Sequence, residues 1–418
     1  MKLYLSLLYT LLLSGCSMTR TEKYADYVNP LIGTDIQKYA RGDKAPSEEK
    51  GQTMPAVGIP NGMTNWVPQT LEGEHKCNPP YYYYHNEIQG FRASHWISGS
   101  CMQDYGSVTI MPLSGELKTD VRERASRFSH DTETARPYYY QVILDDYQIN
   151  AELTGLSRAG LMRFGFPTET KEDRYIVIEP NSDKKSGYLK IDSLNKEITG
   201  YNPAHRIYQG NGKSAGFSGY FVIRFEDSFD SFGTWKDDEI TDGQTEVKGD
   251  GHKVGAWLKL APTKDNSVQV KIGTSFTSIE NARKNLETEI PGWNFETVKK
   301  QSAAKWEEAL SRIVVKSDDN QKKTQFYTAL YNARMLPRTF SDAEGYYPGF
   351  SENYTTHRAE DFTYYCDFSM WDIYRAVLPL YSILSPSAMG DFSKSFLVKG
   401  EQGGWLPIFP MWNNYTAA

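Results

Sequence analysis

The feature that most constrains this fold is a change in the spacing of apolar residues near residue 275. From residue 113 to about 275, short segments rich in β-branched and aromatic residues alternate with turns that contain Gly, Asn, Asp or Pro. Val268, Val270 and Ile272 alternate with polar residues, which is the period of a half-buried strand. The expected strands include 138–144, 150–155, 159–166, 174–178, 219–225, 256–260 and 267–275. Short strands at regular intervals without intervening helices predict a large antiparallel β-sandwich.

After residue 275 the apolar spacing becomes helical. Ser278 is a candidate N-cap for a helix whose Ile279, Ala282 and Leu286 share one face, and Asn294 is the candidate cap of a second helix. We therefore predict a sandwich domain over 24–275, a helical linker over 276–315 and a helical domain over 316–418. That last part has few helices and long loops, so one side of its apolar surface would remain uncovered.

The N-terminus has the pattern of a secretory signal. A Lys at position 2 precedes the apolar run 3–13, which is too short to span a bilayer, and the run ends in Leu13-Ser14-Gly15-Cys16. This sequence resembles a bacterial lipobox and predicts a lipoprotein signal peptide over 1–16, with lipidation at Cys16. The alternative is an ordinary signal peptide with an incidental Cys. We expect a lipoprotein of the bacterial cell envelope, in the periplasm or on the outer-membrane surface, attached to the membrane by the lipid anchor only.

Composition narrows the class of ligand. The net charge is −6 with both signs well mixed, which argues against a nucleic-acid partner. The chain has 29 Tyr and 9 Trp, an excess that fits stacking on carbohydrate rings but also fits a large sandwich core. Cys77, Cys101 and Cys366 are too few and too scattered to predict a disulfide framework, and no pair of them has metal-ligand spacing.

The strongest candidate for ligand binding is the stretch 368–375. If it is helical, Trp371 and Arg375 lie one above the other at i and i+4, and Asp372 and Arg375 are neighbours at i and i+3. A flat aromatic surface beside a charge pair is the chemistry that holds a sugar ring. The alternative is an ordinary amphipathic helix with an internal ion pair and a buried Trp.

Two residues of the N-terminal half are further candidates. His95 and Trp96 are adjacent, so in a strand they would face opposite sides and one of them should point out of the core. Trp66 follows a segment rich in Gly and Pro, 51–65, which favours tight turns and allows backbone to approach a ligand closely. A lone His is more often a structural hydrogen-bonding group than a catalyst.

Several sequence blocks, taken in order, resemble glycoside hydrolase family 92, the secreted exo-acting α-mannosidases. They include Val28-Asn29-Pro30-Leu31-Ile32-Gly33-Thr34 and Ser94-His95-Trp96-Ile97-Ser98-Gly99. The other blocks are 54–63, 289–293, 326–331, 369–375 and 403–407. The resemblance implies an N-terminal antiparallel β-sandwich followed by the first part of an (α/α)6 barrel, with the site between them. It also implies calcium-dependent removal of terminal α-linked mannose from glycans, with an expected α-1,2 linkage and with inversion at the anomeric carbon.

The sequence departs from the family in length. The family's general acid, general base and most calcium ligands lie in a later part of the barrel, so we assign no catalytic residue and no metal ligand in this chain. Asp361, Asp372 and Glu401 are not promoted to those roles. The second departure is the segment 72–84, which contains Cys77 and is more aromatic than the common family form; it affects the leaving-group side of the pocket.

What carries over is the half of the site that holds the sugar. The resemblance implies that Trp371 packs against the ring and that Asp372 and Arg375 hold its hydroxyls. His95 and Trp66 would approach from the sandwich, with His95 as general base a weaker alternative. Two hypotheses follow: the chain is an N-terminal fragment of a lipid-anchored α-mannosidase and is inactive alone, or it is a non-catalytic carbohydrate-binding surface lipoprotein.

Overall fold

The computed structural model describes residues 22–35, 51–168, 172–206, 210–263 and 265–415. The predicted signal peptide and its lipidation site, Cys16, lie outside the described residues. Within the described ranges, no helix combines the length and the apolar character needed to cross a membrane.

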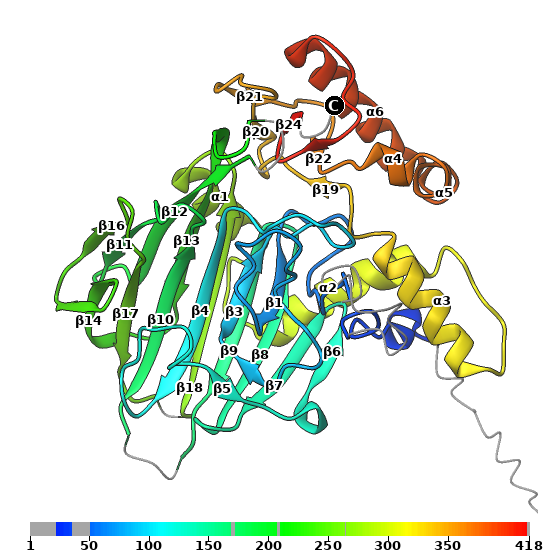
Figure 1. The fold of residues 1–418 in the computed structure, drawn as a ribbon. Coiled ribbons are helices and arrows are strands. Elements are labelled where there is room, and N and C mark those ends of the chain that lie inside the picture. The colour runs from blue at the N-terminus through cyan, green and yellow to red at the C-terminus, as the bar shows by residue number, and fades with distance from the viewer. Residues whose placement is uncertain (1–21, 36–50, 169–171, 207–209, 264, 416–418) are drawn as a thin grey trace, which may run out of the picture.

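Two antiparallel sheets form the N-terminal two-thirds of the molecule (Figure 1). The first sheet has the order β1-β3-β4-β10-β17-β14-β15. Its strands are β1 (Asn65–Gln69), β3 (Gly90–Ser94), β4 (Ser107–Ser114), β10 (Arg174–Asn181), β17 (Val254–Leu260), β14 (Phe229–Lys236) and β15 (Glu239–Asp242). The second sheet has the order β16-β11-β12-β13-β18-β9-β8-β7-β6. Its strands are β16 (Glu246–Lys248), β11 (Tyr188–Asp192), β12 (Glu197–His205), β13 (Ser214–Phe225), β18 (Ser267–Ser275), β9 (Ala159–Gly165), β8 (Ile149–Gly155), β7 (Tyr139–Leu144) and β6 (Thr134–Arg136).

The predicted alternation of apolar residues in 267–275 corresponds to side chains that are buried in the sandwich core. Val268, Val270 and Ile272 of β18 are buried in the main apolar cluster between the sheets. Burial of such side chains is the main stabilising contribution to a sandwich of this kind. The predicted fold class, an antiparallel sandwich followed by helices, is therefore confirmed.

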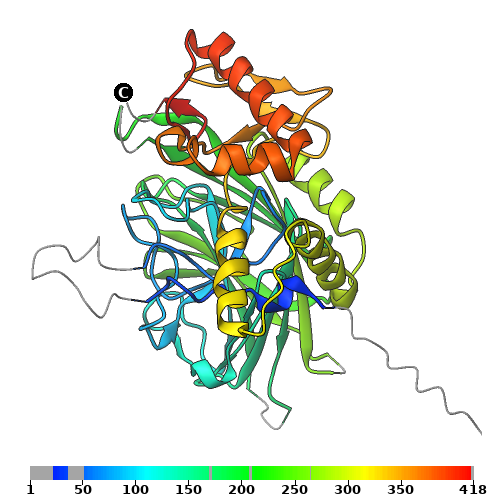
Figure 2. The ribbon, with the colours of Figure 1, turned by 90° about the vertical axis from the view of Figure 1, so that its right-hand side faces the viewer.

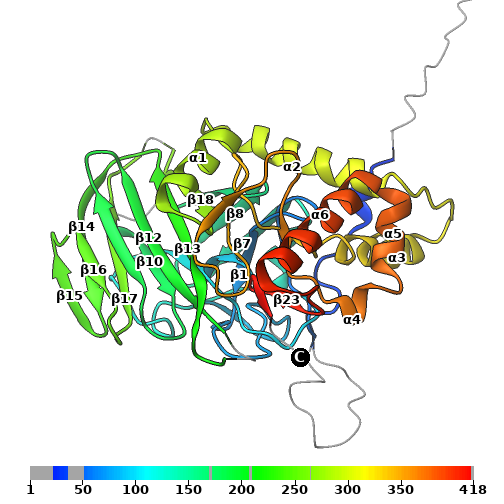
Figure 3. The same cartoon turned by 90° about the horizontal axis from the view of Figure 1, so that it is seen from above.

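Three helices follow the sandwich: α1 (Ile279–Glu289), α2 (Phe295–Leu310) and α3 (Asn320–Asn332). The two predicted caps are present, because Ser278 Oγ accepts a hydrogen bond from the Asn281 amide and Asn294 Oδ1 accepts one from the Thr297 amide. Helix α1 packs on β18 and β13, and α2 packs on β8 and β9, as the view along the sandwich indicates (Figure 3).

A second helical region, α4 (Met370–Ile373), α5 (Val377–Leu384) and α6 (Pro386–Gly403), lies over one end of the two sheets (Figures 1 and 2). An apolar cluster joins it to the sandwich and includes Tyr105, Phe217, Phe276, Phe340 and Trp412. The remaining short elements are η1 (Tyr24–Tyr27), β2 (Glu87–Ile88), β5 (Ser126–Arg127), η2 (His130–Thr132), β19 (Arg338–Thr339), β20 (Tyr346–Pro348), β21 (Thr356–Arg358), β22 (Tyr365–Cys366), β23 (Pro410–Met411) and β24 (Asn414–Tyr415).

The stretch 368–375 does not form one helix, so the condition for the predicted stacking of Trp371 and Arg375 is not met. Helix α4 ends at Ile373, and α5 begins at Val377 with Pro379 inside its first turn. In a continuous helix the ring of Pro379 would clash with the carbonyl of Arg375, so the chain leaves helical geometry before α5 begins. Within the first turn of α5, the missing N–H of Pro379 costs little, because the first N–H groups of a helix have no intrahelical partner.

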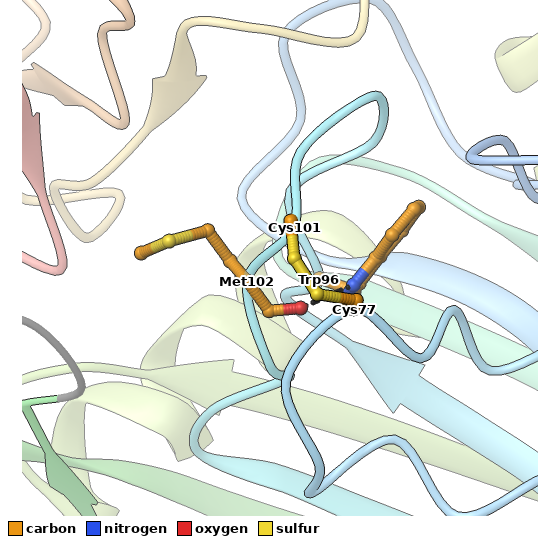
Figure 4. The surroundings of a disulfide bond; sticks show 4 residues. All are labelled: Cys77, Trp96, Cys101 and Met102. Atoms are coloured by element: carbon orange, nitrogen blue, oxygen red, sulfur yellow. Dashed lines mark hydrogen bonds between the residues drawn. A yellow bond between two sulfur atoms is a disulfide. The ribbon is translucent and has the colours of Figure 1, made fainter. Parts of the chain in front are cut away.

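Two of the cysteines that the sequence left unpaired form a disulfide. Cys77 is bonded to Cys101, and Cys366 is a free buried thiol. The bond joins the segment after β1 to the loop after β3, and the indole Nε1 of Trp96 donates a 2.9 Å hydrogen bond to the carbonyl of Met102 beside it (Figure 4). The loop that departs from the family form is thus tied to the rest of the sandwich.

Candidate sugar-binding site

A buried ion pair lies beneath the predicted binding stretch. Arg338 Nε is 2.8 Å from Asp367 Oδ2, and both side chains are almost completely buried. Asp367 also accepts hydrogen bonds from the hydroxyl of Tyr105, at 2.7 Å, and from the amide of Trp412, at 2.9 Å. Burial raises the pKa of Asp367, and the neighbouring Arg338 opposes that rise.

Arg338 connects this pair to the sandwich. Its Nη2 donates to the carbonyl of Trp96 at 2.8 Å, and its Nη1 donates to the carbonyl of Met63 at 3.3 Å. The guanidinium therefore joins two sandwich loops and a carboxylate of the helical region, which fixes the start of the segment leading to Trp371.

The three predicted residues on the helical side are exposed. Trp371 has 64% of its surface exposed, and Asp372 and Arg375 are exposed beside it. Asp372 accepts a hydrogen bond from Ser369 Oγ, and Arg375 Nε donates to the hydroxyl of Tyr374. The expected Asp372–Arg375 charge pair is absent, because α4 ends between the two residues and the i, i+3 geometry is lost. Aromatic surface, carboxylate and guanidinium all face solvent and are available to a ligand.

His95 is placed differently, because it is fully buried just after the end of β3. Its Nδ1 lies 2.8 Å from the carbonyl of Tyr105, which can only accept, so Nδ1 carries the proton. Its Nε2 then accepts a 3.0 Å hydrogen bond from Thr64 Oγ1. Burial, together with nearby Arg338, lowers the pKa of His95 to about 4, so the ring is neutral at neutral pH.

The expectation that either His95 or Trp96 would point out of the core is wrong. Both side chains are fully buried. Strand β3 ends at Ser94, so strand alternation no longer applies to the next two residues. His95 faces the aromatic cluster at the junction, where its ring lies near Phe276, while Trp96 belongs to the apolar cluster that contains Trp306 and Tyr331.

Trp66 is also fully buried, in β1. A Cβ added to Gly155 or Gly160 would lie within 2.3 Å of the Trp66 ring, so these two glycines make room for the indole. The structure therefore places Trp66 between the sheets and His95 at the junction, while Trp371, Asp372 and Arg375 lie on the outer surface of the helical region. The sugar-contact roles of all five residues stay predictions.

The sequence reasoning missed Tyr105, Asp367 and Arg338, which connect the buried His95 to the segment that leads to Trp371. The His95 ring lies 5.4 Å from the Tyr105 ring, and Tyr105 in turn binds Asp367, the partner of Arg338. Asp367 and Tyr105 each lie next to a stretch that had been singled out, but a single sequence gives no signal that they meet.

The remaining carboxylates of the helical region do not form a cation site. Among the described residues there is no group of three or more His, Cys, Asp or Glu side chains arranged to hold a metal ion. Asp361 pairs with Lys394 at 2.7 Å, and this hydrogen bond lowers the pKa of Asp361. Glu401 is exposed.

An apolar surface covers the outer side of α5 and α6 and the segment after them. We call it the α5–α6 face; its most exposed side chains are Ile383, Leu397, Trp405 and Leu406, each at least 60% exposed. A groove of about 320 Å³ runs through this face, lined by Phe368, Met370, Leu378, Met389, Phe392, Ser393, Phe396, Leu397 and Leu406. An apolar patch of this kind usually marks a contact surface.

The fold defines a class of two-part proteins in which an antiparallel β-sandwich is followed by a helical region. Residues 27–275 match the model of the glycosyl hydrolase family 92 N-terminal domain, and residues 281–418 match that of the family 92 catalytic domain. The chain belongs to glycosyl hydrolase family 92.

Solved structures agree with this assignment. The chain is 28% identical to a family GH92 inverting mannosidase from Bacteroides thetaiotaomicron VPI-5482, with a TM-score of 0.81 over 93% of this chain and 50% of that one. It is 29% identical to a family GH92 alpha-mannosidase from the same species, with a TM-score of 0.83 over 96% of this chain and 53% of that one. An uncharacterized secreted glycosidase of Arthroderma benhamiae is 24% identical over 353 residues, which are 75% of this chain and 42% of that protein. The chain thus spans about half the length of the relatives it matches.

Proposed function

We propose that this chain supplies the sugar-holding half of an α-mannosidase that removes terminal α-linked mannose from glycans. The observation that carries the proposal is the exposed group Trp371, Asp372 and Arg375, which lies in the part matched to the family's catalytic domain. The indole offers a flat apolar surface, and the two charged groups offer charge-assisted hydrogen bonds to ring hydroxyls. One of the related mannosidases was solved in complex with mannoimidazole.

His95 and Trp66 have a different role in this proposal. Both are buried: His95 holds the sandwich side of the junction, and Trp66 packs between the sheets. Direct sugar contact by either would require the surrounding structure to open. His95 as general base is a weaker alternative, since both ring nitrogens already have hydrogen-bond partners.

The groups that break the glycosidic bond lie outside this chain in our proposal. An inverting hydrolase needs one carboxylic acid to protonate the leaving oxygen and one carboxylate to activate a water, on opposite sides of the sugar. Asp361 is neutralised by Lys394, and Asp372 belongs to the binding group. The α5–α6 face is the surface on which a further helical segment would pack and complete the barrel.

Calcium enters the proposal only because the chain belongs to family 92, and not because of any site in the described residues. Calcium takes six to eight oxygen ligands, and the described residues do not fit that demand. Its ligands would have to come from the further segment, and no step in this chain depends on it.

Two finer points extend the proposal. The preferred linkage is α-1,2. The location is the cell envelope, through lipidation at Cys16; the related fungal protein is described as secreted, which is consistent with an address outside the cytoplasm.

The second candidate function is sugar binding without hydrolysis. It is favoured by the junction, where the Arg338–Asp367 pair and the aromatic cluster are complete within this chain. One experiment separates the two: the 418-residue chain and a longer product of the same reading frame are assayed on an aryl α-mannoside with calcium. Turnover by the longer product alone supports the mannosidase proposal, and mannose affinity without turnover by either supports the binding protein.

A further inference from the structure

A second polar cavity lies on the sandwich itself, away from Trp371. It has a volume of about 400 Å³, which is within the range of roughly 300–1,000 Å³ typical of small-molecule sites. It is found where β10 ends and β17 begins. Its lining combines carboxyl and amide groups with cationic and imidazole groups: Glu72, Glu74, Gln103, Glu179, Asn181 and Asp183 on one hand, and His75, Lys184, Lys185, His252 and Lys253 on the other.

The polar groups of this cavity are fixed from behind. Glu179 accepts a 2.5 Å hydrogen bond from Arg124 Nη2, and Glu74 Oε1 is 2.7 Å from Arg92 Nη1. Both arginines are fully buried, and Arg92 also pairs with the buried Asp104, so these groups hold the two carboxyl groups from behind without filling the cavity. Gln103, Glu179 and Asn181 are each at least nine-tenths buried although they line an open space.

This lining has spare hydrogen-bonding capacity. A carboxylate can accept about four hydrogen bonds. Asp183 receives one from Gln103 Nε2 and is paired with His205 Nδ1, and Glu179 receives one from Arg124, so acceptor positions remain on both. Sugar hydroxyls donate to such oxygens and accept from side-chain amides and ammonium groups. Because carboxyl groups and lysines both line the cavity, the lining does not favour a ligand of one charge, and it suits a neutral ring with several hydroxyls.

The Cys77–Cys101 disulfide holds two walls of the cavity together. Cys77 follows the wall residue Glu74, and Cys101 precedes the wall residue Gln103. The bond therefore fixes two loops that are distant in sequence, which lowers the conformational cost of ordering them around a ligand. Figure 4 shows how the bond connects these loops beside Trp96.

The cavity also adjoins the junction with the helical region. Asp183 pairs with His205, and the next residue, Arg206, donates to the carbonyl of Tyr415 at 2.9 Å and pairs with Glu352. A ring bound in the cavity would thus lie on the sandwich side of the same boundary that the Trp371 group borders.

We propose that this disulfide-clamped cavity is a second sugar subsite, which takes a neutral hexopyranose unit of the glycan on which the enzyme acts. The assignment of the ligand as part of that glycan rests on the proposed function. The segment 72–84, which departs from the common family form, would in this way give the protein its own preference for the part of the glycan beyond the terminal mannose.

The test is a binding measurement in the Trp371→Ala background, which removes the other sugar-binding group. Titration with α-mannobiose is followed by NMR or calorimetry in a buffer with a chelator, so calcium does not contribute. We expect saturable binding that Glu74→Gln or Asp183→Asn weakens by about tenfold or more, the size of one lost hydrogen bond to a charged group. The matched control is Glu226→Gln, at a residue that follows the end of β13 and does not line this cavity, and it should change the affinity less than about twofold.

A Cys77→Ser/Cys101→Ser variant should also bind more weakly while keeping its fold by circular dichroism. Any of three results would overturn the assignment. The first is an equal effect of Glu74→Gln and Glu226→Gln, the second is no effect of either cavity variant, and the third is no binding by the Trp371→Ala chain. If a longer product hydrolyses the substrate but the cavity does not bind sugar, the subsite proposal fails and the proposed function stands. If the cavity binds sugar but no longer product hydrolyses the substrate, the proposed function fails and sugar binding by the cavity stands.

Discussion

Arg338 and Asp367 form a fully buried ion pair within the helical region, where it meets the sandwich, with Nε 2.8 Å from Oδ2. The pair is enclosed by the Tyr105 hydroxyl on one side and by the carbonyls of Trp96 and Met63 on the other. Because every partner is buried, removal of either charge would leave the other without compensation.

We predict that Arg338→Met lowers the free energy of unfolding by about 3–5 kcal/mol, since it leaves a buried carboxylate unpaired. Urea unfolding followed by fluorescence measures the change. The matched control is Arg127→Ala, which breaks an exposed pair with Asp146 and should cost less than about 1 kcal/mol. Equal effects of the two substitutions would contradict the role given to the buried pair.

His95 should make the stability depend on pH. The pKa of His95 is about 4 in the folded protein, and we take its ordinary value of 6.5 for the unfolded chain. Between pH 4 and pH 6.5 the unfolded chain therefore binds more protons than the folded chain. Stability is then fully present above pH 6.5 and falls as the pH drops toward 4, by at most about 3 kcal/mol from this residue. His95→Gln should flatten that part of the pH profile of unfolding, and a profile with the same slope in both proteins would speak against it.

The exposed Trp371 should matter for sugar binding and hardly at all for folding. With 64% of its surface exposed, Trp371→Ala should change the free energy of unfolding by less than about 0.5 kcal/mol. In a longer, active product it should reduce kcat/KM on an α-mannoside by at least about tenfold, because burial of a large apolar side chain contributes about 1.5–3 kcal/mol. Leu194→Ala, an exposed apolar residue of the β11–β12 turn, is the control and should leave both values unchanged. A fully active Trp371→Ala enzyme would remove the binding role.

The Cys77–Cys101 bond should stabilise the sandwich. The two cysteines are separated by 24 positions, and closure of a loop of that size corresponds to about 3 kcal/mol in the chain-entropy model. The double Cys→Ser variant should therefore unfold at lower urea, as should the parent protein under reducing conditions. A reduced protein as stable as the oxidised one would show that the bond does not constrain the unfolded chain.

The α5–α6 face should make the 418-residue chain self-associate. Exposed apolar surface on this scale favours contact between copies as protein concentration rises. Sedimentation velocity should detect oligomers, and Leu397→Glu together with Trp405→Glu should suppress them, because the two charges interrupt the face. A parent chain that is monomeric at all concentrations would contradict the idea that this face needs a partner segment.

The parts of the fold that depend on local pattern could be predicted from the sequence. The alternation of Val268, Val270 and Ile272 places β18, and the Ser278 and Asn294 caps place the starts of α1 and α2. The helix boundaries near Pro379 were harder to predict from the sequence. Pro379 does not end a helix; it forces the chain to leave helical geometry before α5 and then fits inside the first turn of α5.

The candidate site depends on contacts between residues that are distant in sequence. The pairing of Cys77 with Cys101, the burial of His95 at the junction and the Tyr105–Asp367–Arg338 contacts arise only when the two sheets and the helical region meet. No periodicity marks such contacts. The exposed Trp371, Asp372 and Arg375 were found because they are close together in sequence, although the ion pair expected between the last two is not formed.

The most direct test of the account is hydrolysis of an aryl α-mannoside by the purified 418-residue chain in the presence of calcium. The account predicts no turnover, because the proposed function gives residues 1–418 the sugar-holding group and not the groups that break the bond. Turnover that persists after contaminating enzymes are removed, and that disappears in the Trp371→Ala variant, would contradict it.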